Sequence, residues 1–244
     1  LQITPDTPRL SRARGTIAFT DTGFSVAGVQ ARALGGEVRI DGGLTSLSGS
    51  VAQPTAGKPG APQVLRMQGT ASAEGLRQAR ELGFAGRLAE YANGTAAYTA
   101  TLGFRGGIPE LAIQSSLVGM GLSLPAPFAK APDAPLPLRL DMAAVRATAP
   151  AAGESSARRQ DQLQLDVGKL LNIVYVRDLS GAEPRVLRGS IAAGLADDET
   201  APLPGDGVVA NFNMASLDMD AWSAVLSRAA GADLSANHLV SSDS

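Results

Sequence analysis

The sequence predicts a mainly β fold with a few short helices. Apolar residues recur at a spacing of two along most of the chain, which is the spacing at which alternate side chains leave opposite faces of a strand. Near the N-terminus this spacing is followed by Ile17, Phe19, Phe24, Val26, Val38 and Ile40. Glycines separate the alternating segments, and this punctuation is typical of an antiparallel meander of short strands.

The spacing changes only in the middle of the chain and near its end. A further strand is expected around Val64 to Met67, after a Pro- and Gly-rich loop at 53–63 that cannot occupy a central strand. Between 73 and 92 the helical spacing of Leu76 with Ala79, and of Leu88 with Tyr91, predicts two short helices.

Alternation then returns and predicts four strands of one sheet. The residues that carry it are Tyr98, Ala100, Leu102, Phe104, Leu111, Ile113, Leu122, Leu124, Leu136, Leu138, Leu140 and Met142. Residues 1–147 are therefore interpreted as one sheet module with short helices.

The remaining residues are divided by composition. The polar segment 148–161 has no period and is interpreted as a flexible loop or hinge, at which a subdomain boundary could lie. Residues 162–231 continue the sheet and end in a helix near 219–230, for which Asp218 or Asp220 is the expected N-cap. Residues 232–244 are expected to be a frayed tail.

Charge and cysteine content exclude several classes of protein. The 244 residues carry 21 basic and 23 acidic side chains, a net charge of -2, so no field attracts a phosphate backbone and nucleic-acid binding is not expected. Without cysteine there is no disulfide scaffold and no thiolate metal site.

No catalytic constellation is visible, so an enzyme is not expected. The single histidine, His238, lies in the terminal tail, and no nucleotide-binding or nucleophile-elbow motif follows a predicted strand. Acidic residues at Asp197, Asp198 and Glu199, and at Asp218 and Asp220, lack the spacing of a calcium loop. We expect no metal and no cofactor.

The uncharged stretch 111–129 is long enough to raise the question of a membrane span. Its serines, Gln114, Pro125 and Pro127 favour strands and a turn over a helix in lipid. Because Leu1 is not a start methionine, the expectation is an internal piece of a longer protein.

The segment SSLVGMGLSLPAPFAK, residues 115–130, carries a resemblance to a known family. It is similar to a turn motif of the YhdP branch of the AsmA-like family, matched at Ser115, Leu117, Gly119, Leu124, Pro125, Pro127 and Lys130. The segments 15–42 and 216–222 resemble other stretches of that branch, so the likeness spans most of the chain. Phe128 departs from the pattern without altering the turn.

The resemblance implies a periplasmic segment of a bridge-like protein that moves phospholipids between the inner and outer membranes and supports the outer-membrane barrier. It also implies a strongly curved antiparallel sheet, a half-barrel or β-taco, with an apolar groove. The parent protein would be anchored in the inner membrane by a helix outside this segment. Its partners would be phospholipid or another acyl lipid, the remaining repeats of the same chain, and envelope proteins.

Residues expected to line this groove are Tyr98, Leu102, Phe104, Leu111, Ile113, Leu122, Leu124, Leu138 and Leu140, and the family turn is Leu124, Pro125, Pro127 and Lys130. The same leucines fit the dry core of a β-sandwich equally well. The alternative function is therefore a non-catalytic structural or interaction module of a bacterial envelope protein. The phase of a strand does not say which face meets lipid.

Overall fold

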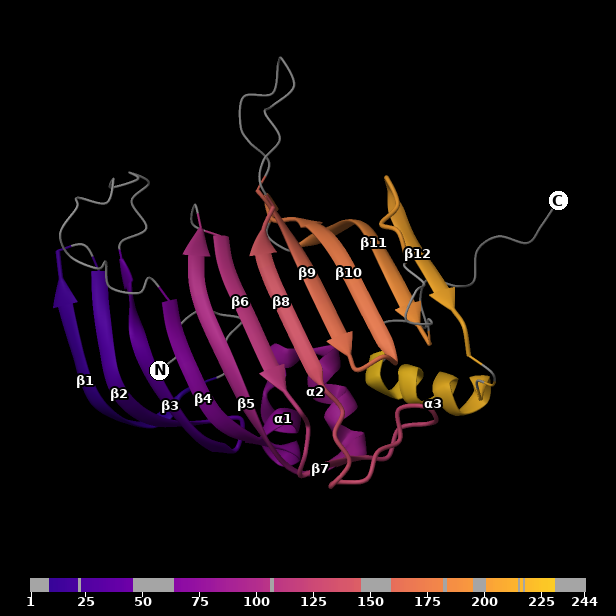
Figure 1. Cartoon of the computed structure of the whole chain (residues 1–244), viewed down its shortest axis with the longest axis horizontal. Helices are drawn as coiled ribbons and strands as arrows, with labels where there is room; N and C mark the ends of the chain where they lie inside the picture. The colour runs from indigo at the N-terminus through magenta and orange to yellow at the C-terminus, as the bar shows by residue number, and fades with distance from the viewer. Residues whose placement is uncertain are drawn as a thin grey trace, which may run out of the picture.

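One curved sheet forms most of the molecule (Figure 1). The structure is a computed structural model that describes residues 9–21, 23–45, 64–105, 108–145, 159–181, 184–194, 201–214, 216 and 218–230. All strands except β7 follow the spatial order β1-β2-β3-β4-β5-β6-β8-β9-β10-β11-β12. The strands are β1 Ser11–Thr20, β2 Gly23–Ala33, β3 Gly36–Thr45, β4 Val64–Ser72, β5 Ala92–Arg105, β6 Ile108–Ser115, β7 Met120–Leu122, β8 Leu138–Ala144, β9 Gln160–Val167, β10 Leu171–Asp178, β11 Arg185–Ala193 and β12 Gly207–Phe212.

Short helices occupy the stretch where the sequence changes its period. They are α1 Ala73–Gln78, α2 Phe84–Leu88 and the single 3₁₀ turns η1 Arg80–Leu82 and η2 Ala89–Tyr91. The Ser72 hydroxyl caps α1 by accepting a bond from the Gly75 amide at 3.0 Å. A last helix, α3 Met219–Ala230, begins after Asp218, whose carboxylate accepts a bond from the Ala221 amide at 2.9 Å. The predicted helices and the Asp218 cap are confirmed.

The pairing of the strands places apolar side chains on one face of the sheet. Directly paired residues share a face, so the register traces rows of side chains across the sheet. One row, from β1 to β12, is Ile17, Val26, Gly42, Leu65, Leu102, Leu111, Met142, Leu163, Tyr175, Gly189 and Val208. The next row, from β2 to β12, is Val29, Ile40, Met67, Ala100, Ile113, Leu140, Leu165, Ile173, Ile191 and Ala210.

The opposite face is polar over most of its width. Its corresponding row, from β1 to β12, is Arg14, Gln30, Arg39, Gln68, Thr99, Gln114, Arg139, Asp166, Asn172, Ala192 and Asn211. We call the two sides the apolar face and the polar face. This division means that the sheet has one side suited to water and one that is not.

A bulge in β2 keeps its two halves in the same phase. The pairing with β3 shifts between Val26 and Val29, so one extra residue is accommodated and both valines face the apolar side. Gly28, at φ 57°, turns the bulge, and its amide donates to the Asp41 carboxylate at 2.6 Å. The Arg39 guanidinium and this amide lower the pKa of Asp41. Asp41 is thus held ionised as the anchor of the bulge.

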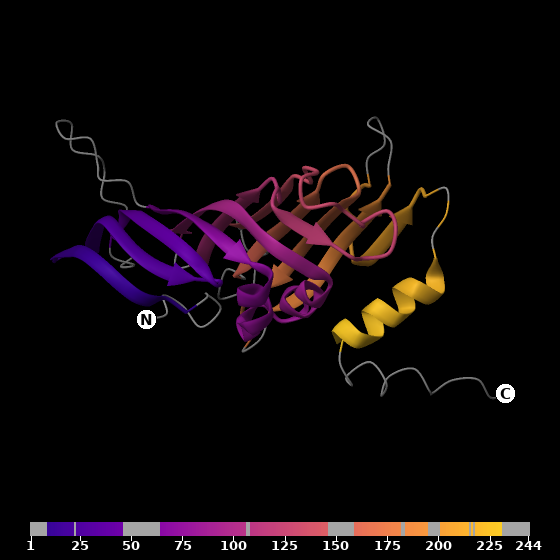
Figure 2. The same ribbon diagram turned by 90° about the horizontal axis from the view of Figure 1, so that it is seen from below.

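The sheet curls toward its apolar face and does not close into a barrel (Figure 2). On strands β2 to β5 the apolar side chains form a tight cluster, in which Leu65 and Leu102 are each only 2% exposed. The described members of this cluster come from the sheet itself, with Leu10 beside them, so curvature brings them together where a flat single layer would leave them open. We call this cluster the packed end.

Helices α1, α2 and α3 lie along one end of the strands (Figures 1 and 2). Ala73 and Leu76 of α1 pack on Ala96 of β5, which is on the apolar side because it alternates with Leu102. α2 packs against α3. The three helices therefore form a lip along one edge of the curved apolar face.

Three features of the sheet differ from the sequence prediction. β7, the strand expected around Leu122 and Leu124, leaves the main path of the sheet and pairs with the start of β5 and, at Leu122, with Lys130. β12 runs parallel to β11, because the chain crosses over between them instead of turning back. The third is the start of β9 at Gln160, inside the segment 148–161 that was expected to be a loop or hinge; β9 pairs with β8, so the sheet continues there as expected.

Several predictions fall on residues that the structure does not describe. They concern the loop 53–63, most of the hinge 148–161, the acidic cluster at Asp197, Asp198 and Glu199, and the tail 232–244 with His238.

Gly42 offers a test of how closely the backbones of β3 and β4 approach each other. It sits in the apolar row at φ 121°, and a Cβ there would lie 2.1 Å from the Val64 carbonyl oxygen. We expect Gly42→Ala to lower the free energy of unfolding by about 1–3 kcal/mol, because backbone must shift. Gly205→Ala, with nothing within 4 Å of the added carbon, is the matched control. Equal urea midpoints for the two variants would contradict this account.

Candidate functional site

The apolar face is open over strands β6 to β11. Its side chains there are half-buried, in contrast to those of the packed end. We define the accessible apolar face by Leu111, Ile113, Leu138, Leu140, Met142, Leu163, Leu165, Ile173, Tyr175 and Ile191. These residues form a contiguous apolar surface several strands wide, which is unusual on the outside of a protein unless something covers it.

Seven of the predicted groove residues lie on the apolar face, in two different settings. Leu111, Ile113, Leu138 and Leu140 belong to the accessible apolar face. The other three are at the packed end: Leu102 inside its cluster, with Tyr98 and Phe104 partly buried against it.

The Tyr98 phenol stays neutral at ordinary pH. Burial raises the pKa of Tyr98 above its usual range. The ring therefore adds apolar area to this face without adding a charge.

Leu122 and Leu124 lie away from the apolar rows. Leu122 is in β7, where it packs against the small cluster that joins α1 to β5. Leu124 follows the end of β7 in the connecting segment. The structure thus brings the family turn motif to the helical lip and not to the accessible apolar face.

The turn motif is organised by Lys130. Its ammonium group donates to the carbonyl oxygens of Met120 at 2.6 Å, Ala131 at 3.0 Å and Pro132 at 3.5 Å. The Lys130 backbone also exchanges two hydrogen bonds of 2.9 Å with Leu122. A point charge that satisfies three carbonyls holds a long irregular segment in one shape.

The same loop receives the last helix. The Trp222 indole of α3 donates from Nε1 to the Ala126 carbonyl at 3.1 Å, and its ring meets Phe128 edge-on at 5.4 Å. Phe128, the residue that departs from the family pattern, thus gives the loop an aromatic contact with α3.

Sequence reasoning placed strands at β9 and β10 but missed their contribution to the face. Leu163 and Leu165 pair with Met142 and Leu140, and Ile173 continues the same row. Their alternation was the available signal. Tyr175 alternates with Ile173 in the same way, and Gly189 on the neighbouring strand has no side chain, which leaves room for the tyrosine ring.

An ion pair on the apolar side was also missed. Arg177 donates to Asp161 from Nε at 2.9 Å and from Nη2 at 2.5 Å, and the pair lies one position beyond Tyr175 and Leu163 on the same side. The Asp161 side chain is 2% exposed and that of Arg177 17%. This bidentate pair ends the apolar surface at the strand ends opposite the helical lip.

A family model described as YhdP protein matches residues 1–242. The chain belongs to the YhdP family. Neither curated proteins nor solved structures gave a match.

Membership in the YhdP family makes the chain part of a lipid-transport-related envelope protein. Among the described residues no helix has both the length and the hydropathy needed to cross a membrane.

Removing Arg177 is expected to be costly. Arg177→Ala leaves a carboxylate that is almost fully buried without its partner, and we expect a loss of about 3–5 kcal/mol in the free energy of unfolding. The double variant Asp161→Ala with Arg177→Ala should recover part of that loss, because no charge is then stranded. Denaturant titration of both measures the difference, and a double variant less stable than the single one would argue against a stranded charge.

Replacing Lys130 is expected to loosen the lip. Lys130→Met keeps the apolar stem but removes the ammonium donor, which should cost about 1–3 kcal/mol. Trp222, the only tryptophan, reports the change through a red-shifted emission as its contact with Phe128 loosens. Lys169→Met, in the exposed turn between β9 and β10, is the control. Unchanged Trp222 emission in Lys130→Met would show that the loop does not depend on this amine.

Proposed function

We propose that the chain is a periplasmic segment of a bridge-like lipid-transfer protein that carries phospholipids between the inner and outer membranes and supports the outer-membrane barrier. One observation carries the proposal: the accessible apolar face, which is continuous across β6 to β11 and is backed by polar side chains on β6, β8 and β9. YhdP family membership supports it. The work is binding and shielding, with no chemical step and no cofactor.

The energetics favour acyl chains as the covering partner. Burying a methylene contributes roughly 0.8 kcal/mol, so exposing about ten of them to water costs roughly 8 kcal/mol. A sheet curled toward an apolar surface offers those methylenes an environment like that of the bilayer. The gain is non-directional, so a chain can slide along rows of leucine and isoleucine without breaking specific bonds.

The proposed route runs across the strands. The apolar rows cross every strand of the main sheet, whereas along a strand the apolar surface is limited by the Asp161–Arg177 pair at one end and by the helical lip at the other. Further repeats of the same protein would extend the rows. An inner-membrane helix elsewhere in the parent protein would anchor it, and envelope proteins would be additional partners.

The packed end favours the second candidate, a non-catalytic structural or interaction module. There the apolar side chains cover one another, and Leu65 and Leu102 are 2% exposed, as in an ordinary dry core. This arrangement would serve to hold the curvature if lipid binds only over β6 to β11, and it would be the whole function if lipid does not bind at all.

The proposal is tested with pairs of adjacent residues whose side chains point to opposite faces of the sheet. A photoreactive amino acid is placed in the full-length parent protein at Leu140 or Ile113, on the accessible apolar face, and at Arg139 or Gln114 as matched controls on the polar face. We expect lipid adducts, detected by mass spectrometry after irradiation in cells, at the first two positions only. A probe at Leu122, in the helical lip, should give few.

Two results would contradict lipid transfer by this face. Adducts of equal yield on both faces would mean non-specific contact with membrane. No adducts at Leu140 or Ile113 in a folded, functional protein would favour the structural module.

A further inference from the structure

The Asp161–Arg177 ion pair lies directly beside the accessible apolar face. It belongs to a row of side chains on the apolar side that crosses β8 to β11 at the strand ends, namely Ala144, Asp161, Arg177 and Val186. The pair therefore lies between apolar neighbours. A buried ion pair often contributes no more to stability than apolar residues of similar volume would. Its place in this row suggests a role other than stability.

The Arg177 guanidinium keeps hydrogen-bond donors that Asp161 does not use. Asp161 accepts bonds from Nε and from Nη2, and among the described residues the Nη1 group has no acceptor. The Asp161 side chain is 2% exposed and that of Arg177 17%, so the guanidinium is the more accessible partner. Because a guanidinium only donates, its remaining N–H groups can bind the oxygen atoms of a ligand.

The apolar surface between the helical lip and the pair has the length of an acyl chain. Along β10 the stretch from Leu171, at the lip end, to Arg177 measures about 20 Å at the rise of an extended strand. An acyl chain spans half of the hydrocarbon core of a bilayer, or about 15 Å. A lipid whose acyl chains lie parallel to the strands therefore fits on this surface with its phosphate close to Arg177.

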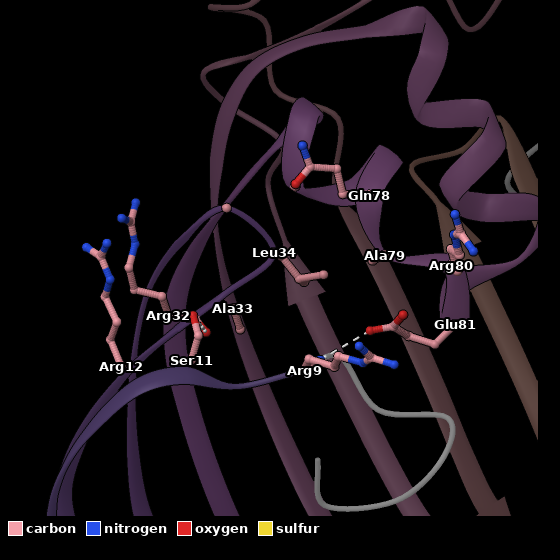
Figure 3. A pocket seen from close by; sticks show the side chains of 12 residues that line it. Arg9, Ser11, Arg12, Arg32, Ala33, Leu34, Gln78, Ala79, Arg80 and Glu81 are labelled. Carbon is pink, nitrogen blue, oxygen red and sulfur yellow. Dashed lines mark hydrogen bonds between the residues drawn. The ribbon is translucent and has the colours of Figure 1, made fainter. Parts of the chain in front are cut away.

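A cluster of arginines at the packed end does not offer this arrangement. Arg9, Arg12, Arg32 and Arg80 line a cavity of about 570 Å³ between the N-terminal strands and the segment from α1 to η1 (Figure 3). In Figure 3, Arg12 and Arg32 extend away from Arg80. The apolar side chains next to this cavity belong to the closed cluster of the packed end, which leaves no open apolar surface beside these arginines.

We propose that Arg177, held in place by Asp161, binds the phosphate of a lipid headgroup, and that the acyl chains extend from there along the strands toward the helical lip. The inference rests on the proposed function and adds the orientation of the lipid that crosses β9 and β10. Because the ion pair carries no net charge, directed hydrogen bonds from the guanidinium position the phosphate, while burial of the acyl chains supplies most of the affinity.

Photoreactive phosphatidylglycerol tests this orientation. Two forms, with a diazirine in the headgroup or at the end of an acyl chain, are irradiated with the 244-residue chain in maltoside micelles, and mass spectrometry locates the attachment sites. We expect the headgroup probe on Ala144 and Val186, beside the ion pair, and the acyl probe on Leu138 and Leu171, at the lip end of their strands. The reverse pattern, or the same sites for both probes, would overturn the proposal.

Replacing the ion pair by apolar residues tests the phosphate contact itself. Asp161→Leu with Arg177→Met removes both charges and strands neither, so we expect the fold to persist, which thermal melting checks. The affinity for fluorescent phosphatidylglycerol should fall about tenfold or more, because hydrogen bonds from a charged group are lost. Fluorescent diacylglycerol with the same acyl chains should bind as tightly as before. An unchanged affinity for phosphatidylglycerol would show that Arg177 does not bind the phosphate.

The matched control is the exposed ion pair of Arg139 and Asp141 on the polar face, whose Nε–Oδ2 distance is 2.5 Å. Arg139→Met with Asp141→Leu makes the same chemical change away from the apolar side, and it should leave the binding of both lipids unaltered. If this variant loses phosphatidylglycerol as fully as the Asp161 and Arg177 variant does, the loss is not specific and the proposal is wrong. The labelling of the wild-type chain decides the orientation even if a variant does not fold.

Failure of the headgroup site and failure of lipid binding give different results. If the wild-type chain binds both lipids equally and the two probes label the same positions, lipid binding stands and the headgroup site is wrong. If neither probe labels the chain, the proposed function fails for this segment. Calorimetry with inorganic phosphate separates the sources of the anion: binding of free phosphate without lipid, lost in the Asp161 and Arg177 variant, would replace the headgroup site by a free-phosphate site.

Discussion

The structure depends on one constraint, namely that apolar side chains stay on the same face from each strand to the next. In a sheet the side-chain period is two, so a slip of one residue in any strand would put its leucines in water and its arginines among apolar groups. The bulge at Gly28 shows how the constraint is met where the sequence itself changes phase. Asp41, on the polar face, fixes that bulge from the neighbouring strand. Curvature, packed end and accessible face all follow once the phase is kept.

Local sequence rules were enough to predict the strands, the short helices and the Asp218 cap, because these depend on period two, period 3.6 and capping chemistry. The departures arise where long-range pairing decides. β7 has the alternation of a strand, but Gly94 and Gly119 bring their backbones so close that it pairs with the start of β5. The parallel pairing of β12 depends on a crossover whose length and composition resemble those of any loop.

For the candidate site, sequence predicted which residues alternate but not how deeply each would be covered. Leu102 and Leu140 are both flanked by non-apolar residues in the sequence and face the same side of the sheet. Leu102 is nevertheless almost fully buried, inside the cluster of the packed end, whereas Leu140 is half-buried on the accessible apolar face. The Asp161–Arg177 pair joins residues 16 positions apart, so no local motif announces it. The turn motif was the clearest signal of the family, yet its residues hold the loop of the helical lip in shape and do not line the accessible apolar face.

The parallel pairing of β12 has a consequence for the route of the chain. When neighbouring strands alternate in direction, successive strands end at opposite sides of the sheet, alternately at the helical lip and at the strand ends opposite it. Since β12 runs in the same direction as β11, the chain leaves the sheet at the helical lip, where β11 also ends. From these strand ends a short connection after Phe212 is enough to bring α3 to α2 and to the loop that contains Ala126. If β12 ran antiparallel to β11, the chain would leave the sheet at the opposite strand ends, where the Asp161–Arg177 pair lies. Helix α3 could then not join α1 and α2 in the helical lip.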